Sequence, residues 1–132
     1  MDTKDMRQAL HPSQLGQFIG TENYIRHSLN RSFIMTDGTH YLTRHGLAWL
    51  IDLIASMQLG NKQIREQEFQ AWYLQKHADN SCNVICTDGN RDQLYNQLIE
   101  YTDYPYDRLS LYVTDTELAG KPVKVCMLTS EY

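Results

Sequence analysis

The sequence predicts an α+β fold in which N-terminal helices, including one long buried helix at about 46–58, pack on a C-terminal antiparallel β-meander of four to five strands. Two observations support this prediction. Apolar residues recur at helical spacing within 46–58, and from residue 67 onward they alternate with polar residues as in half-buried strands. The length suits one domain, residues 1–132, with 1–11 expected to form a frayed tail.

Three short elements are expected before the long helix. Residues 11–18 contain a Pro-Ser pair that is typical of the start of a short helical turn. Residues 19–29 fit either an irregular segment or a short helix capped by Thr21. Residues 31–38, "RSFIMTDG", indicate a short strand that ends in an Asp-Gly turn.

The long helix is the clearest element of the chain. Its apolar positions recur with the helical period at Leu47, Leu50, Ile51 and Ile54. A helix that is apolar around most of its circumference is usually buried. Gly60 then supplies a C-terminal stop.

The second half of the chain alternates with a period of about two. The stretches that show this pattern are 68–77, 81–90, 92–105, 106–115 and 121–132. Residues 92–102 fit a helix as well as a strand, because Leu94 and Leu98 suit both periods, and the aromatic and β-branched residues there favour the strand. The short connectors hold Gly, Asn or Asp, as hairpins require.

Composition and charge exclude several classes of protein. The net charge is −4, with 12 basic and 16 acidic residues, and the basic residues are scattered, which disfavours nucleic-acid binding. No apolar run approaches the roughly 20 residues of a membrane span, and the N-terminus lacks the pattern of a signal peptide. Three cysteines, an odd number, argue against a disulfide framework. We therefore expect a cytoplasmic protein that does not enter a membrane.

The histidines and cysteines do not form a recognisable metal or catalytic pattern. His40 and His45 lie within "TDGTHYLTRHG", and on a continuous helix they would point about 140° apart. Cys82 and Cys86 would lie roughly 13 Å apart along a strand, too far for one metal ion. We therefore predict no metal, no cofactor and no catalytic residue, and we interpret residues 36–46 as the joint between a strand and a helix.

Polar residues near the long helix are the candidates for a ligand pocket. Asp52 stands on an otherwise apolar helix, and a buried carboxylate needs a partner. His27, His40 and Asp52 are therefore predicted to converge on a pocket between the 46–58 helix and the sheet, unless Asp52 lies on an exposed or hydrogen-bonded helix face.

Aromatic residues are the candidates for a protein interface. The chain has nine tyrosines, and those gathered around a proline turn are Tyr101, Tyr104, Tyr106 and Tyr112. Tyrosine provides a large contact area at a low entropy cost. The same residues also suit half-buried positions of a sheet, so both interpretations stay open.

Several blocks of the chain, in this order, resemble a small bacterial family known as a domain of unknown function and found in cyanobacteria, proteobacteria and mobile elements. The blocks are "GTENYIRH" (20–27), "TDGTHYL" (36–42), "AWLIDLIASMQ" (48–58), "EFQAW" (68–72), "IEYTDYP" (99–105) and "SEY" (130–132). The family has no established activity, so the resemblance implies no catalytic residues. His27 and Asp52 lie in matching blocks, whereas residues 43–45 depart from the pattern.

These observations favour a non-enzymatic cytoplasmic protein that acts through protein–protein contact with another protein or with a second copy in a homo-oligomer. The resemblance and the small size also favour a role as an accessory or counter-defence (inhibitor) protein of a phage or mobile element. The alternative is a small enzyme or small-ligand-binding domain that uses the pocket. A weaker alternative is a nucleic-acid-contacting regulator that uses Arg26, Arg31 and Arg44.

Overall fold

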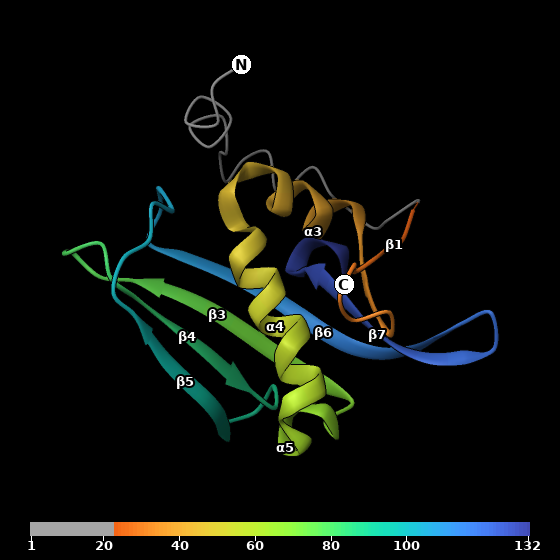
Figure 1. The fold of residues 1–132 in the computed structure, drawn as a ribbon. Helices are drawn as coiled ribbons and strands as arrows, with labels where there is room; N and C mark the ends of the chain where they lie inside the picture. Colours follow the sequence, from red (N-terminus) through yellow and green to blue (C-terminus); the bar gives the residue numbers. More distant parts are fainter. Residues whose placement is uncertain (1–22) are drawn as a thin grey trace.

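The computed structural model describes residues 23–132. The fold is a seven-stranded sheet with a kinked helix on one face (Figure 1). The strands are β1 (Ile25–Arg26), β2 (Phe33–Met35), β3 (Phe69–Lys76), β4 (Cys82–Thr87), β5 (Gln93–Ile99), β6 (Arg108–Leu118) and β7 (Lys121–Leu128). They lie in the order β1-β2-β7-β6-β3-β4-β5. The expectations for the tail 1–11 and the helical turn 11–18 fall outside the described residues.

The α+β class is confirmed, but the sheet has seven strands and mixed pairing, whereas the prediction was an antiparallel meander of four to five strands. All five strands expected in the second half are present. Residues 92–102, which fitted a helix as well as a strand, contain strand β5. However, β6 pairs with β3 rather than with β5, and β2 joins the sheet parallel to β7. All three residues of β2 are buried, so this strand has no alternation by which its pairing could have been recognised.

The helical region lies in the middle of the chain, not at its N-terminal end, because β1 and β2 precede it. It consists of α3 (Asp37–Leu42), the π-helix η1 (Thr43–Leu47), α4 (Ala48–Gly60) and the short α5 (Lys62–Arg65). The predicted helix 46–58 corresponds to α4. A kink separates α3 from α4, because His45 leaves helical geometry and Gly46 adopts a φ of 94°, which glycine tolerates far better than other residues.

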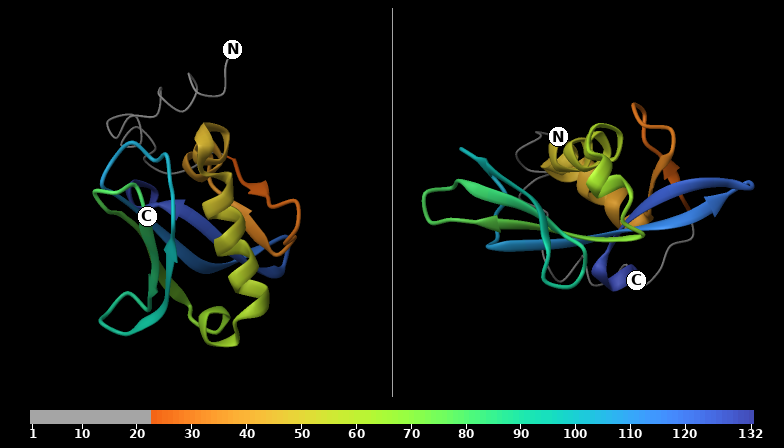
Figure 2. Two further views of the ribbon diagram at one scale, coloured as in Figure 1. Left: turned by 60° about the vertical axis from the view of Figure 1, so that its left-hand side comes forward. Right: turned by 90° about the horizontal axis from the view of Figure 1, so that it is seen from below.

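The main core lies between α4 and the sheet face beneath it (Figure 2). The largest fully buried side chains there include Phe33, Leu42, Leu47, Leu50, Ile51, Ile54, Ile64, Trp72, Leu74 and Leu111. Each such side chain stabilises the fold by about 1.5–3 kcal/mol through the loss of water contact. The predicted strand face of Cys82, Val84 and Cys86 is buried in this core.

The joint between β2 and α3 is held by the last residues of the chain. Thr36 is the N-cap of α3, and residues 129–131 form a short 3₁₀ turn, η2 (Thr129–Glu131). The Glu131 carboxylate accepts hydrogen bonds from the Thr36 hydroxyl at 2.6 Å, the Gly38 amide at 3.1 Å and the Leu128 amide at 2.9 Å. The strand-to-helix joint expected within residues 36–46 is therefore present, but it consists of Thr36 alone, because Asp37 and Gly38 form the first turn of α3 rather than a separate turn.

Candidate functional site

Two of the three predicted pocket residues meet, but they form a structural contact. His27 Nε2 lies 2.8 Å from Asp52 Oδ1, and His27 Nδ1 accepts hydrogen bonds from the backbone amides of Leu29 and Asn30, both at 3.1 Å. Because Nδ1 is an acceptor, Nε2 carries the hydrogen and donates a hydrogen bond to the Asp52 carboxylate. Neither ring nitrogen is left to take a proton from a substrate.

The His27–Asp52 contact ties the turn after β1 to helix α4. The His27 side chain is buried, whereas the Asp52 side chain is 57% exposed, so Asp52 is not the buried carboxylate on which the pocket prediction depended. The Asn30 side chain adds a second tie by donating to the Ala55 carbonyl at 3.0 Å. The pair therefore positions residues 27–30.

His40 lies apart from His27 and Asp52. It lines a separate surface hollow of about 350 Å³ with Asp37, Tyr41, Arg44 and His45. Among residues 23–132 no group of three or more His, Cys, Asp or Glu side chains is arranged to hold a metal ion. In the described residues, His40 is therefore separated from the His27–Asp52 pair and lines a hollow without them.

The four candidate tyrosines do not form one surface. Tyr101 is 68% exposed, but Tyr104 is 3% exposed and donates a hydrogen bond to the Arg108 carbonyl at 3.1 Å. Tyr106 packs edge-on against Tyr104, and Tyr112 is half-buried in an aromatic group on a different part of the sheet. Tyr104 is therefore a core residue with no face for a partner.

The three cysteines are buried free thiols. Burial raises the pKa of the Cys82 thiol, and burial together with the nearby Asp88 carboxylate raises the pKa of Cys86 to about 12. Burial likewise raises the pKa of Cys126 to about 12. A thiol that stays protonated at neutral pH is a poor nucleophile, so the native surroundings of these residues do not support catalysis.

Alkaline solution should destabilise the protein. Burial also raises the pKa of Tyr104 to about 12, so Cys86, Cys126 and Tyr104 keep their protons at a pH where the unfolded chain has lost them. Stability is therefore complete below about pH 9 and falls toward pH 12, by about 1.4 kcal/mol per pH unit for each group that differs by one proton. Urea unfolding measured at several pH values tests this, and a free energy of unfolding that is constant across that interval would contradict it.

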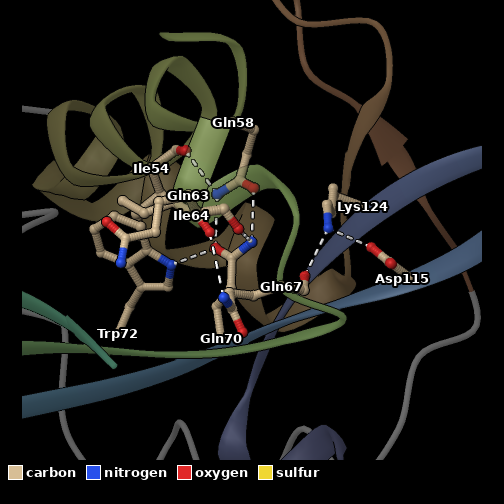
Figure 3. Close-up of polar contacts among 9 residues, drawn as sticks. All are labelled: Ile54, Gln58, Gln63, Ile64, Gln67, Gln70, Trp72, Asp115 and Lys124. Atoms are coloured by element: carbon tan, nitrogen blue, oxygen red, sulfur yellow. Dashed lines mark hydrogen bonds and ion pairs between the residues drawn. The ribbon is translucent and has the colours of Figure 1, made fainter. Parts of the chain in front are cut away.

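A buried polar network stands beneath α4 and α5 (Figure 3). The Gln70 side-chain amide donates to Gln58 Oε1 at 2.8 Å and to the Ile64 carbonyl at 3.0 Å. Its oxygen accepts from Gln58 Nε2 at 2.8 Å and from the Trp72 indole at 2.9 Å. Gln58 Nε2 also donates to the Ile54 carbonyl at 3.2 Å. Because these donors and acceptors are matched, the network fixes the two helices on β3.

A cleft of about 460 Å³ opens beside this network, between the C-terminal part of α4 and strands β6 and β7. Its lining residues are Asn30, Ser32, Gln58, Leu59, Arg65, Asp115, Pro122, Val123 and Lys124. Lys124 Nζ is already engaged by the Asp115 carboxylate and by the Gln67 carbonyl at 2.8 Å (Figure 3). The cleft lies where a helix–sheet pocket was expected, but His27, His40 and Asp52 do not line it.

Strand β5 forms one edge of the sheet (Figures 1 and 2). In the part of the chain that the structure describes, β5 pairs with β4 alone, so its other side presents backbone amides and carbonyls. Its seven residues, "QLYNQLI", contain neither charge nor proline, and Leu98 is 58% exposed. Sequence reasoning missed this feature, since the uncharged stretch is visible in the sequence but its place at the edge is not.

None of the helices between residues 23 and 132 is long and apolar enough to cross a membrane. The comparisons with known proteins agree with the resemblance noted in the sequence. A family of unknown function, DUF6876, matches residues 9–132, and the chain belongs to this family. No curated protein and no solved structure matches the chain.

Proposed function

We propose that this member of a family of unknown function is a non-enzymatic cytoplasmic protein that acts by binding another protein. Strand β5 is the contact, and an extended segment of the partner adds to the sheet beside it. The resemblance and the small size further suggest an accessory or inhibitor protein of a phage or mobile element.

The main support is the edge at β5, whose outer side pairs with no other strand among residues 23–132. Natural sheets usually guard an exposed edge with lysine, proline, a bulge or a covering element. β5 has one irregularity near its start, where its register shifts opposite Cys86 and Thr87, and it pairs regularly from Tyr95 to Ile99. β5 has no charged residue between Gln93 and Ile99, whereas the other edge is formed by β1, which is only two residues long. Addition of a partner strand would satisfy the open backbone groups of β5 with a ladder of hydrogen bonds.

Side chains near β5 add contact area. Leu98 and Tyr101 are exposed to 58% and 68%, and Asn96 and Gln97 also lie at the surface. Leucine and tyrosine at an edge provide apolar area. The side-chain oxygens of Asn96 and Gln97 accept hydrogen bonds from Asn83 and Tyr95, and their NH2 groups can donate to a neighbouring strand. Tyr101 is thus the predicted interface tyrosine best placed to take part.

The experiment introduces a charge at the edge. Leu98→Lys should abolish capture of the partner from a lysate of the source organism by the tagged protein, because lysine at an edge opposes strand addition. Leu59→Lys is the matched control, since Leu59 has the same exposure, 59%, but lies at the end of α4. Light scattering on the purified protein shows whether the partner is a second copy of the chain.

Hydrogen exchange makes the test specific to the strand. Outward-facing amides of residues 93–99 should exchange quickly in the free protein and become protected in the complex. Capture that survives Leu98→Lys and is lost in Leu59→Lys would place the contact at the cleft and contradict the proposal.

Binding of a small ligand in the cleft is the second candidate function. Its volume of about 460 Å³ lies within the range of about 300–1,000 Å³ typical of ligand sites, and Leu59, Pro122 and Val123 provide an apolar lining. Thermal shift with a library of small molecules tests this alternative, and a Leu59→Lys variant should then lose the stabilisation.

A further inference from the structure

The outer side of β5, at the edge of the sheet, is suited to pairing with a second copy of the same strand (Figure 1). A two-fold symmetric interface places the same surface on both sides, so a charge near the axis meets its own copy. β5 has no charged residue from Gln93 to Ile99, although the chain carries a net charge of −4. Two copies that repel each other through their net charge can therefore approach closely along this strand.

The rim of the main core runs along β5. Tyr95 and Ile99 lie opposite Cys86 and Cys82 of β4, so they face α4, and both are only partly buried against the core. The Tyr95 ring also packs on Trp72, with the ring centroids 6.0 Å apart. A strand added beside β5 would cover the part of these two side chains that is still exposed.

The regular stretch from Tyr95 to Ile99 is self-complementary when two antiparallel copies are centred on Gln97. Tyr95 then lies opposite Ile99 of the second copy, and the same pair recurs on the other side of the axis. An aromatic residue opposite a β-branched one stabilises an antiparallel pair of strands. On the outer face, Leu98 lies opposite Asn96 of the second copy.

Other registers fit less well. Centring on Asn96 would place Tyr95 opposite Gln97 and would bring Asp92 toward Glu100 of the second copy. Like charges opposite each other destabilise an antiparallel pair. A shift in the other direction also separates the aromatic residue from its β-branched partner, so the register centred on Gln97 is favoured.

Gln97 itself supplies a polar contact on the axis. Its side chain is exposed, and its oxygen accepts a hydrogen bond from the Tyr95 hydroxyl. Its NH2 group can donate to Gln97 of the second copy, and symmetry adds the reverse bond. The chain already contains a reciprocal amide pair of this kind between Gln58 and Gln70, with both bonds 2.8 Å long.

We propose that β5 pairs with β5 of a second copy in an antiparallel dimer whose two-fold axis passes through Gln97. The two sheets then form one continuous sheet with both α4 helices on the same face, because directly opposite residues point to the same side. This inference rests on the proposed function, since it uses the same edge and supplies its regulation. The second copy covers β5 until the partner protein displaces it.

Charge reversal on the axis tests the dimer in the purified full chain. Light scattering should show association as the concentration rises. Gln97→Lys and Gln97→Glu should each weaken the dimer by about tenfold or more, because each brings two like charges together. An equimolar mixture of the two variants should restore it. Gln63→Lys, at an exposed glutamine of α5, should leave association unchanged, and circular dichroism checks that each variant is folded.

The mixture separates a specific dimer from a general effect of charge. The inference is overturned if the original chain stays monomeric at millimolar concentration. It is also overturned if the mixture of Gln97→Lys and Gln97→Glu associates no better than either variant alone. Hydrogen exchange of the dilute chain reports on the free edge, and outward-facing amides of residues 95–99 should become protected as the dimer forms.

A disulfide on the axis tests the regulation. Gln97→Cys should form an intermolecular disulfide on mild oxidation, since directly opposite residues have Cβ atoms about 4.5–5.5 Å apart. Gln93→Cys is the matched control, because residue 93 is also exposed on β5 but lies far from its own copy in this register. The three native cysteines are buried.

The oxidised Gln97→Cys dimer should lose capture of the partner protein and regain it after reduction. Equal capture before and after reduction would overturn the inference. Capture by a chain that never dimerises would contradict this inference alone, whereas a dimer that captures no protein would contradict the proposed protein contact. The two failures can therefore be told apart.

Discussion

Replacement of Gln70 by alanine should lower the free energy of unfolding by about 3–5 kcal/mol. The change leaves the Trp72 indole N–H and Gln58 Oε1 without their partner. It also removes one hydrogen bond each from Gln58 Nε2 and the Ile64 carbonyl, which keep those to the Ile54 carbonyl and the Gln67 amide. Gln70 is completely buried, so water cannot easily replace the lost side chain. Each buried polar group left without a partner costs about 1–3 kcal/mol, and the cavity adds to that cost.

Urea unfolding measures this loss, with Gln63→Ala as the control. Gln63 is an exposed glutamine of α5, and its substitution should change stability by no more than about 0.5 kcal/mol. The double variant Gln58→Leu/Gln70→Leu should cost less than the sum of its single variants, because it removes both partners of the amide pair. Strict additivity would show that the two glutamines are not energetically coupled.

Replacement of Glu131 by alanine is the second large effect, with an expected loss of about 2–3 kcal/mol. Its carboxylate accepts hydrogen bonds from Thr36, Gly38 and Leu128, so the substitution loosens the joint at the start of α3. Gly38 packs closely on this carboxylate, since a Cβ at Gly38 would lie 2.5 Å from Glu131 Oε1.

Thermal unfolding checks this expectation against two further variants. Glu131→Gln should cost less than Glu131→Ala, because its remaining oxygen can still accept from Thr36 and Leu128. Glu117→Ala removes an exposed glutamate of β6 and should leave the midpoint nearly unchanged. Equal midpoints for Glu131→Ala and the original chain would show that the joint does not depend on this carboxylate.

Local periodicity predicts much of the fold. The stripe of Leu50, Ile51 and Ile54 locates α4 within two residues, and alternation locates all five strands of the second half. Pairing partners could not be predicted in the same way. β2 is three residues long and buried throughout, and nothing in its sequence distinguishes a parallel neighbour from an antiparallel one.

The candidate site was predicted less well, for reasons of geometry. Asp52 does have a partner in His27, but two backbone amides occupy the other ring nitrogen of that histidine. His40 precedes the kink, so it faces a different surface. Tyr104 is buried because it packs in the main core, where the Arg108 carbonyl accepts a hydrogen bond from its hydroxyl, and no sequence pattern reveals such a contact.

The pairing of β2 with β7 also affects how the chain folds. Phe33 is opposite Lys124, so one of the earliest described strands can complete its hydrogen bonds only with the last strand. Contacts between such distant segments slow folding, because the chain loses the entropy of closing a long loop before these contacts can stabilise it. On the ribosome, Phe33, Ile34 and Met35 therefore emerge well before their partner strand. We expect them to stay exposed until β7 has been synthesised, and exposed apolar surface of this kind promotes aggregation of folding intermediates.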